Sequence, residues 1–563
     1  MRTICIMLCS AMILLCLVAC THQKIPSDQG AIRNVDEWVR ATTVPLSDNL
    51  DGYHHAVSTL HSGAQRYFDQ GLVMSFAFNH AESVRSFRAA QTLDQNCAMC
   101  YWGEALALGP NINVTRHGQV IMESEAHMAA YTAIQKAVSL KDRVTEKERD
   151  YIDTLAVRYH ADASVDRSQL DIAYMNAMRS LSLKYPDDND AAALFAEAMM
   201  DTMPWNYWIN PDIPRALTKE VIATLETVLN RAPNHPLALH LYIHAVEASS
   251  TPGRAESAAD RLRNLVPSAG HLVHMPSHIY WRVGRYQDAA EANAQAIAVD
   301  ENYIATCHVR NFYSAVYYPH NLHFLWAAYS MEGRSQLAVK TARKIAASIP
   351  MEMVERFPVT EFFKTIPLLA LANFGQWSEI LIEPQPSVHL LFSNGIWRYV
   401  RAVAYTKLGQ LDAARMEYAA LQTIRQATGV AQLDAVDYPA TLLLQIADQL
   451  VQGEILMAEG SHAKAIDSFK AAVTIQSQLP YTEPPFWYYP TQLSLGKALL
   501  ESGDGAQAEN VYRENLKHYP KNGWALYGLM RALEVQGKDS NAVRVEFNRA
   551  WQRADVKLSA SRF

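Results

Sequence analysis

The sequence predicts an all-α protein: a solenoid in which pairs of antiparallel helices stack into an α-α superhelix. The first observation is a repeated offset, since His274 follows His240 by 34 residues and Gly537 follows Gly503 by the same number. The second is that apolar residues recur about every 3.6 residues along most segments, which is the period of a helix. A fixed offset between 20 and 50 residues is typical of repeat architectures.

A period of 34 residues is that of the tetratricopeptide repeat (TPR), in which each repeat is one helix pair. The sequence therefore predicts a TPR-like helical-repeat solenoid with two regions, a histidine-rich repeat region over residues 51–345 and a C-terminal TPR array over residues 346–563. The helices expected from the apolar pattern include residues 64–72, 80–90, 97–108, 123–140, 146–159, 168–185, 190–200, 397–408, 415–421, 450–459, 466–475, 493–502 and 524–536.

Residues 1–20 resemble a bacterial lipoprotein signal and are not expected to belong to the fold. Arg2 supplies a positive charge, and the apolar run that follows is too short for a transmembrane helix. The run ends at Cys20, which we expect to be lipidated after cleavage; the alternative is an ordinary secretory signal with a chance cysteine. Residues 21–50 are polar and predict a flexible tether. The expected location is the cell envelope, with attachment through the lipid alone and the outer membrane favoured.

Seven histidines fall on corresponding positions of three successive repeats. Spacings of three, four or seven residues keep side chains on one helical face, and stacked repeats place such faces side by side. We therefore expect the rings to face one concave groove. Helices that each offer two or more histidines are typical of metal sites in helical proteins. The candidate ligands are His240, His244, His271, His274, His278, His320 and His323.

The metal at such a site would be a transition metal, Zn, Cu or Fe, since imidazole suits all of these. Glu247, Glu197 and Asp201 are candidate carboxylates for the same groove. The alternative is that the histidines form hydrogen bonds between helices or line a groove for a peptide. Pro276 falls inside an expected helix, where it removes a backbone hydrogen bond. This position fits a functional site or a simple kink.

Cys97 and Cys100 form a Cys-x-x-Cys motif. In an oxidising envelope such a pair can close as a disulfide, act as a redox pair or bind copper. The histidine of a c-type haem attachment site does not follow the pair. His80 is expected to pack in the core instead of binding a ligand.

Two connectors are unusually aromatic, and the last residues are charged. Residues 203–208 are expected either to form a ligand wall or to pack over the end of the repeats. Residues 483–490 are expected on the concave side as a wall or stop. Residues 549–563 are expected to form a terminal cap that frays.

The composition excludes several functions. The net charge is −7 and only 19% of residues are charged, whereas nucleic-acid binding requires clustered Lys and Arg. We therefore expect no nucleic-acid partner. The sequence also contains no Gly-rich phosphate loop, Gly-x-Ser-x-Gly turn or dinucleotide fingerprint. Any catalysis would then depend on the metal, and the sequence does not decide whether the protein is an enzyme.

Five short strings are more specific than the repeat pattern. They are residues 78–82 (Phe-Asn-His-Ala-Glu), 97–103 (Cys-Ala-Met-Cys-Tyr-Trp-Gly), 109–113 (Gly-Pro-Asn-Ile-Asn), 271–280 (His-Leu-Val-His-Met-Pro-Ser-His-Ile-Tyr) and 318–324 (Tyr-Pro-His-Asn-Leu-His-Phe). With these strings, the chain resembles a group of bacterial TPR lipoproteins over most of residues 50–540. The resemblance implies the solenoid and the envelope location, and it implies no particular activity.

Two functions follow as hypotheses. In the first, the protein is a lipid-anchored metalloprotein that stores or senses a transition metal or uses it for hydrolytic or oxidative chemistry. In the second, it is a non-catalytic scaffold whose concave groove binds a peptide or partner protein, which is the common role of such repeats.

Overall fold

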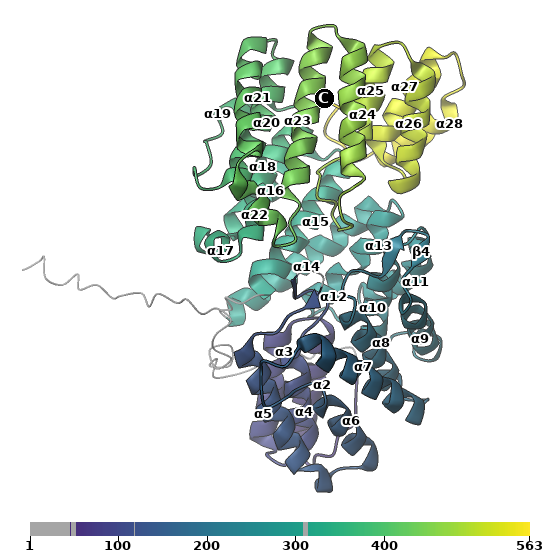
Figure 1. The fold of residues 1–563 in the computed structure, drawn as a ribbon. Helices are drawn as coiled ribbons and strands as arrows, with labels where there is room; N and C mark the ends of the chain where they lie inside the picture. The colour runs from purple at the N-terminus through teal and green to yellow at the C-terminus, as the bar shows by residue number, and fades with distance from the viewer. Residues whose placement is uncertain (1–44, 47–51, 117–118, 308–312) are drawn as a thin grey trace, which may run out of the picture.

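The computed structural model describes residues 45–46, 52–116, 119–307 and 313–563. Figure 1 shows antiparallel helices stacked into a curved column, with the N-terminal repeats in purple and blue at one end and the C-terminal repeats in yellow at the other. Strands are confined, within these ranges, to two short pairs. The fold is an all-α, TPR-like helical-repeat solenoid, as the periodicity predicts. The signal, Cys20 and most of the tether lie outside the described residues.

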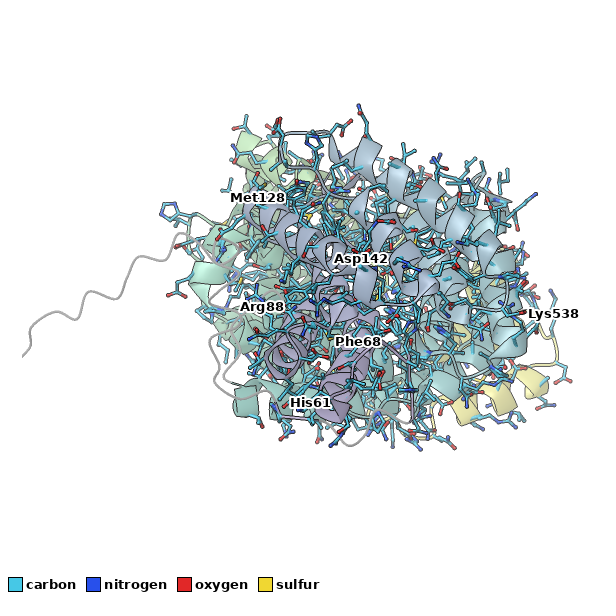
Figure 2. All side chains as sticks on the ribbon, turned by 90° about the horizontal axis from the view of Figure 1, so that it is seen from below. His61, Phe68, Arg88, Met128, Asp142 and Lys538 are labelled. Carbon is cyan, nitrogen blue, oxygen red and sulfur yellow. A yellow bond between two sulfur atoms is a disulfide. The ribbon has the colours of Figure 1, made fainter. Side chains whose placement is uncertain are left out.

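The N-terminal repeats occupy one end of the column. In Figure 2, which views the molecule from that end, Phe68 lies among the helices; its side chain is fully buried, whereas Asp142 is exposed. The elements are α2 (Ser62–Phe76), α3 (His80–Leu93), α4 (Ala98–Leu108), β1 (Thr115–Arg116), β2 (Gln119–Val120), α5 (Ser124–Ser139), η1 (Lys141–Arg143), α6 (Glu146–Ala156), α7 (Arg167–Lys184), α8 (Asn189–Asp201), β3 (Trp208–Asn210), β4 (Ile213–Pro214) and α9 (Thr218–Arg231).

The middle repeats contain the break that Pro276 predicts. Proline has no N–H to donate to the preceding turn, and one helical stretch is accordingly divided into α12 and α13 on either side of Met275. The elements are α10 (Pro236–Val246), η2 (Pro252–Ala255), α11 (Glu256–Leu262), α12 (Gly270–His274), α13 (Pro276–Arg282), α14 (Tyr286–Cys307), η3 (Tyr313–Tyr317), α15 (Tyr318–Met331) and α16 (Ser335–Ser348).

The C-terminal array completes the column. Its elements are α17 (Met351–Arg356), η4 (Pro358–Thr360), α18 (Glu361–Asn373), α19 (Trp377–Ile382), α20 (Leu391–Lys407), α21 (Leu411–Arg425), α22 (Thr428–Asp434), α23 (Ala440–Ala458), α24 (His462–Gln476), α25 (Gln492–Glu501), α26 (Gly505–His518), α27 (Gly523–Val535) and α28 (Asn541–Ala550). None of the helices in the described ranges combines the length and apolarity that crossing a membrane requires.

Within a repeat, a glycine of one helix faces an aromatic ring of the next helix. A Cβ at Gly71 would lie 2.7 Å from the Phe87 ring, and a Cβ at Gly496 would lie 2.4 Å from the Tyr512 ring. In both pairs the ring follows the glycine by 16 residues. A larger residue would clash with the ring in this close-packed interior. The same close approach at both ends of the chain is direct structural support for one repeating unit.

The C-terminal repeats also fold back onto the middle of the chain. Gly284 and Gly333 end repeats with φ of +74° and +68°, a backbone region that glycine adopts without steric cost. A Cβ at Gly284 would lie 2.2 Å from the backbone oxygen of Pro520, and one at Gly333 would lie 2.4 Å from the Trp551 ring. These two turns are therefore contact points between distant parts of the sequence.

The prediction that residues 549–563 fray is wrong. The Arg562 side chain is buried and donates to the backbone oxygens of Asn373 and Ala372 at 3.0 and 3.1 Å and to the Tyr488 hydroxyl at 2.8 Å. Satisfying the guanidinium in this way offsets the cost of burying its charge. Residues 549–563 are thus held by hydrogen bonds to α18 and to the aromatic residues 483–490.

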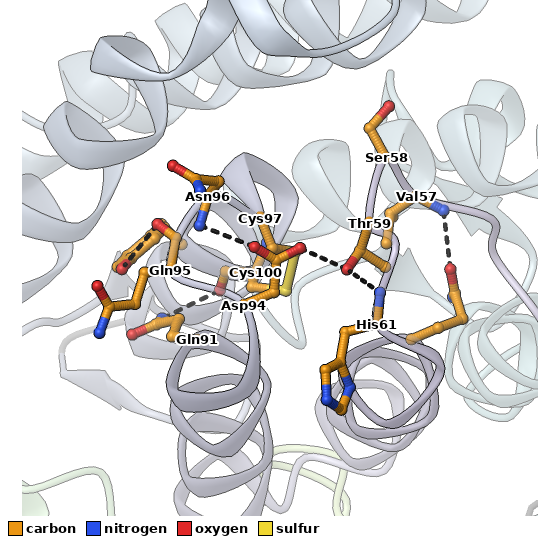
Figure 3. Close-up of a disulfide and its surroundings, with 12 residues drawn as sticks. Val57, Ser58, Thr59, His61, Gln91, Asp94, Gln95, Asn96, Cys97 and Cys100 are labelled. Atoms are coloured by element: carbon orange, nitrogen blue, oxygen red, sulfur yellow. Dashed lines mark hydrogen bonds between the residues drawn. A yellow bond between two sulfur atoms is a disulfide. The ribbon is translucent and has the colours of Figure 1, made fainter.

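Cys97 and Cys100 form a disulfide at the start of α4 (Figure 3), the first of the three alternatives open from the sequence. Both side chains are fully buried. Asp94, in the turn before them, accepts hydrogen bonds from the Thr59 hydroxyl at 2.5 Å and from the backbone N–H of Asn96 at 2.9 Å. The disulfide therefore belongs to the packed junction between α3, α4 and the segment that precedes α2.

Candidate metal centre

The seven candidate histidines lie on four helices in the middle of the column (Figure 1). α10 carries two of them, α12 two, α13 one and α15 two. Six of the side chains are buried and only that of His320 is partly exposed. The rings expected to face one concave groove are thus enclosed by the packing of these helices inside the solenoid.

Six of the seven rings gather into two sets. The first imidazole group consists of His240, His244 and His271, and the second imidazole group consists of His274, His278 and His320. Within each group the three residues offer ring nitrogens that all lie within 4.8 Å of one another. Zn–N bonds are about 2.0–2.1 Å long, so each set needs only small side-chain movements to share one ion.

Hydrogen bonds fix the protonation of two rings in the first imidazole group. Nδ1 of His240 lies 2.7 Å from the backbone oxygen of Phe76, and Nδ1 of His244 lies 2.8 Å from a carboxylate oxygen of Glu247. Both oxygens only accept, so each Nδ1 carries the proton and donates it. Each Nε2 is then an unprotonated lone pair. Neither Nε2 has a hydrogen-bond partner, and neither nitrogen of His271 has one.

The second imidazole group shows the same arrangement. Nδ1 of His278 lies 2.6 Å from the other carboxylate oxygen of Glu247, and Nδ1 of His274 lies 2.7 Å from the amide oxygen of Asn293. Both Nδ1 atoms are donors, yet the two Nε2 atoms face each other at 3.0 Å. Two lone pairs at that distance repel unless a cation, either a proton or a metal ion, lies between them.

Two other histidines among the described residues, the half-buried His80 and the buried His235, have both ring nitrogens paired. In His80, Nδ1 lies 2.6 Å from the backbone oxygen of Ala107 while Nε2 accepts from the Asn111 amide at 3.1 Å. In His235, Nε2 contacts Asp190 at 2.9 Å and Nδ1 accepts from a backbone N–H. Buried polar atoms normally find partners. The unpaired nitrogens are therefore concentrated in the first imidazole group, although Nε2 of His323, outside both groups, also has no partner.

The electrostatic environment favours the neutral form of five of these rings. Burial lowers the pKa of His240, His271, His274 and His320 well below the usual value, and neighbouring rings lower it further. Burial also lowers the pKa of His244, although Glu247 opposes the effect. Burial alone would raise the pKa of Glu247, but His278 and His244 outweigh it and bring the value to about 2. Neutral imidazole is the form that binds metal ions.

Each group is covered by one phenylalanine. The Phe78 ring centroid lies 4.6, 6.5 and 5.6 Å from those of His240, His244 and His271. Phe324 lies 5.1, 4.8 and 5.5 Å from the three rings of the second imidazole group. Apolar rings at these positions exclude water and strengthen interactions between the nitrogens and a cation.

Backbone strain is concentrated at the first imidazole group. Phe78 and Trp205 have φ of +55° and +59°, and only four non-glycine residues in the described ranges have positive φ. Both rings contact this group, since the Trp205 centroid lies 5.0 Å from that of His244. Such conformations cost about 1–3 kcal/mol each and tend to persist at functional sites.

Trp205 also separates the first imidazole group from solvent. Its indole N–H donates to Asn113 at 3.1 Å, and Asn113 donates to the Tyr317 hydroxyl at 3.2 Å. The Tyr317 ring lies 4.7 Å from that of His271. Trp205 remains 38% exposed, so it forms the outer surface of a cover over the group. Of the aromatic loop 203–208, Trp205 therefore packs against the first imidazole group.

Removing this cover is expected to speed metal exchange. In Trp205→Gly, which suits the positive φ, release of bound metal to a chelator should be on the order of tenfold faster, about 1.4 kcal/mol of barrier. In Trp205→Phe, which retains a ring, the rate should stay close to wild type. The measurement is stopped-flow transfer of metal to a chromophoric chelator. Equal rates in all three proteins would show that Trp205 is not the barrier.

The aromatic segment at residues 483–490 places a second carboxyl group, that of Glu483, beside the second imidazole group. Glu483 Oε2 is buried without a hydrogen-bond partner and lies 3.8 Å from Nδ1 of His278. The Tyr481 hydroxyl donates to Glu483 and lies 3.4 Å from Glu247. Burial, and then the charge of Glu247, raise the pKa of Glu483 well above its usual value. Beyond Glu483 the segment lines a small aromatic cavity formed by Trp281, Trp326, Trp487, Trp524, Tyr488 and Tyr489.

Three sequence candidates lie in neither group. The His323 ring stacks on Trp326, with centroids 5.4 Å apart, and packs against Phe362 at 5.1 Å. Asp201 is bound instead by Arg158, whose guanidinium donates to it at 2.6 Å. Glu197 is half-buried on the same helix as Asp201, and loss of solvent around its carboxyl raises its pKa to about 7. Glu247 does reach the groups, but through Nδ1 atoms, so it orients the rings.

Comparisons with known proteins match one family model over the last repeats and several solved structures of low similarity. The family model described as "Tetratricopeptide repeat" matches residues 493–555. No curated protein matches the chain. Similar solved structures include a human IFIT1 dimer with m7Gppp-AAAA (12% identity, 93% of this chain and 100% of that chain, TM-score 0.32) and the APC/C hetero-tetramer Cut9–Hcn1 (12%, 86% and 90%, TM-score 0.29). Another is the TPR domain of P58(IPK) (10%, 84% and 98%, TM-score 0.21).

Several residues of the site were not singled out from the sequence. Phe78 and Phe324 lie inside the specific strings at residues 78–82 and 318–324, so their position beside histidines was a usable signal. Asn113 likewise belongs to the string at residues 109–113. Asn293 lies on α14 in an unremarkable stretch, and its contact with His274 has no signal in the sequence.

Proposed function

We propose that this TPR-like protein binds a transition metal in its buried imidazole cluster. Helical repeats of this type are protein-binding scaffolds, and the fold supports that coarser role. In our proposal, metal binding is a second function beside this scaffold role. Zn, Cu and Fe all accept imidazole ligands, and which of them is bound decides whether hydrolytic or oxidative chemistry is available.

One observation carries this proposal: unprotonated Nε2 atoms converge while the Nδ1 atoms of the same rings are fixed by hydrogen bonds. Metal-binding histidines almost always donate the second ring N–H to a carboxylate or carbonyl oxygen. Here the acceptors are Glu247, the Asn293 amide oxygen and the backbone oxygen of Phe76. These bonds select the tautomer that presents Nε2 to a metal.

The alternative, in which the histidines serve only interhelix hydrogen bonds, fits less well. An unpaired buried polar group costs about 1–3 kcal/mol, and the first imidazole group contains four such nitrogens. His80 and His235 have both ring nitrogens paired, whereas Nε2 of His323, which packs against aromatic rings outside both groups, has no partner. A bound metal removes the penalty by giving each lone pair a partner.

Zinc binding to chelator-stripped protein tests the proposal. The wild type is expected to bind Zn²⁺ tightly in equilibrium dialysis. In the His274→Ala/His278→Ala double variant the bound amount should fall while the circular dichroism stays helical. His389→Ala, which alters an exposed histidine, is the matched control and should bind like wild type. No tight binding by the wild type, or unchanged binding by the double variant, would contradict the proposal.

We also propose that the protein is anchored in the cell envelope by lipid on Cys20, facing the periplasm or the exterior. The apolar run ending at Cys20 and the polar stretch after it support this. Mass spectrometry of the mature N-terminal peptide should find a lipidated cysteine, and Cys20→Ser should release the protein from the membrane fraction. An unmodified Cys20, or membrane association that survives the substitution, would contradict lipid anchoring. The acidic net charge keeps the absence of a nucleic-acid partner as a prediction.

A further inference from the structure

The buried cluster contains two sets of three imidazoles that share no ring, and a third set, His244, Glu247 and His278, links them. Three rings belong to the first imidazole group and three to the second, and each set offers mutually close nitrogens. The groups are neighbours, since the ring centroids of His271 and His274 lie 5.7 Å apart and those of His244 and His278 lie 5.5 Å apart. Six imidazoles exceed the four ligands of one tetrahedral ion, and here they divide evenly.

Glu247 connects the two compartments. One carboxylate oxygen accepts from Nδ1 of His244 in the first imidazole group, and the other accepts from Nδ1 of His278 in the second. Its side chain is buried and lies directly after α10, which ends at Val246. Because both oxygens are used on Nδ1, the carboxylate aims one Nε2 into each compartment and places one negative charge between two positions for cations.

The covers are also separate. Phe78 contacts all three rings of the first imidazole group, and Phe324 contacts all three rings of the second. The two phenylalanines come from distant repeats, on the turn before α3 and on α15. Two similar chambers, each with three imidazoles and one apolar cover, are built from different parts of the sequence.

From this geometry we propose a binuclear centre: two transition-metal ions, each bound by the three imidazoles of one group, with Glu247 as the shared positioning residue. The proposal rests on the proposed metal-binding function and adds the number of ions, their ligand sets and the residue that couples them. Three protein ligands per ion leave a further coordination position open on each, as in catalytic zinc sites. Two ions so close together can act on one small ligand.

Zinc titration of the full chain against a competing chromophoric chelator tests the number of ions bound per chain. Stripped wild-type protein is expected to take up two equivalents. His240→Asn/His271→Asn and His274→Asn/His320→Asn should each take up one, and their combination none. His323→Asn, whose ring lies outside both groups, is the matched control and should keep two. Circular dichroism of each variant checks that the fold is retained.

Glu247→Gln distinguishes a shared positioning residue from a local one. A glutamine amide has one accepting oxygen, so it cannot accept from both Nδ1–H groups. We expect two equivalents to remain, with affinity weakened roughly 10–100-fold, the usual effect of losing such a partner. Unchanged affinity at both positions would overturn the role of Glu247.

The outcomes separate the two proposals. A single equivalent in the wild type would overturn the binuclear centre while leaving metal binding intact, and this result does not depend on any variant folding. No equivalent in the wild type would overturn the proposed function itself. Loss of both equivalents in each folded double variant would show one indivisible site and would also overturn the division into two groups.

Discussion

Metal-free protein is expected to unfold as the pH is lowered from 7 to about 5. Burial lowers the pKa of six histidines below the usual value near 6.5, and that of His323 falls to about 3. The unfolded chain therefore binds more protons below pH 6.5. The stability that these residues contribute is complete above that pH and is lost as the pH falls toward the folded pKa values.

The expected effect is large. Each such histidine lowers the free energy of unfolding by about 1.4 kcal/mol per pH unit once its unfolded form is protonated, so six together approach about 8 kcal/mol per unit. Total stabilities are about 5–15 kcal/mol. Urea unfolding of stripped protein at several pH values measures this slope.

His323 offers a control for the acid effect that leaves the metal ligands intact. His323→Phe keeps an aromatic ring against Trp326 and Phe362 and removes one titrating group. The pH slope should fall by about 1.4 kcal/mol per unit while metal binding is unchanged. A stability that does not vary between pH 7 and 5 would contradict the burial of neutral imidazoles.

Adding metal to the stripped protein is expected to raise its stability by about 4 kcal/mol for each ion at a free concentration a thousand times the dissociation constant. An ion bound by the second imidazole group would replace the repulsion between the Nε2 atoms of His274 and His278, and one bound by the first group would give its unpartnered nitrogens a partner. The measurement is the urea midpoint with and without Zn²⁺.

Two variants show which histidines produce the metal-dependent increase in the free energy of unfolding. His274→Ala/His278→Ala should lose the part that depends on the second imidazole group, whereas the exposed-site variant His389→Ala should keep the whole gain. Equal midpoints with and without metal in the wild type would contradict a metal bound only by the folded protein.

The fold was predictable because its causes repeat along the chain. The 34-residue offset and the helical apolar period reflect local contacts between neighbouring helices, and a helix predicted at residues 146–159 is found as α6 at Glu146–Ala156. Two contacts between the middle and the C-terminal repeats were not predictable, those of Gly284 with Pro520 and of Gly333 with Trp551. Residues about 220–240 positions apart leave no periodic signal in the sequence.

The candidate site was predictable as a set of residues but not as a geometry. Helical spacing correctly placed His240 and His244 on one face, yet it did not reveal that the face is buried or that the rings divide into two groups. His323 follows His320 by three residues and still packs among Phe362 and Trp326. Which neighbour a ring meets depends on the adjacent helix, and the sequence spacing alone does not contain that information.

Elemental analysis of the protein, isolated from its native source without chelators, tests the central claim most directly. Imidazoles with fixed Nδ1 donors and converging, unprotonated Nε2 atoms should retain transition metal through purification, with two ions per chain. A protein that is folded and lacks transition metal above the buffer background would contradict it.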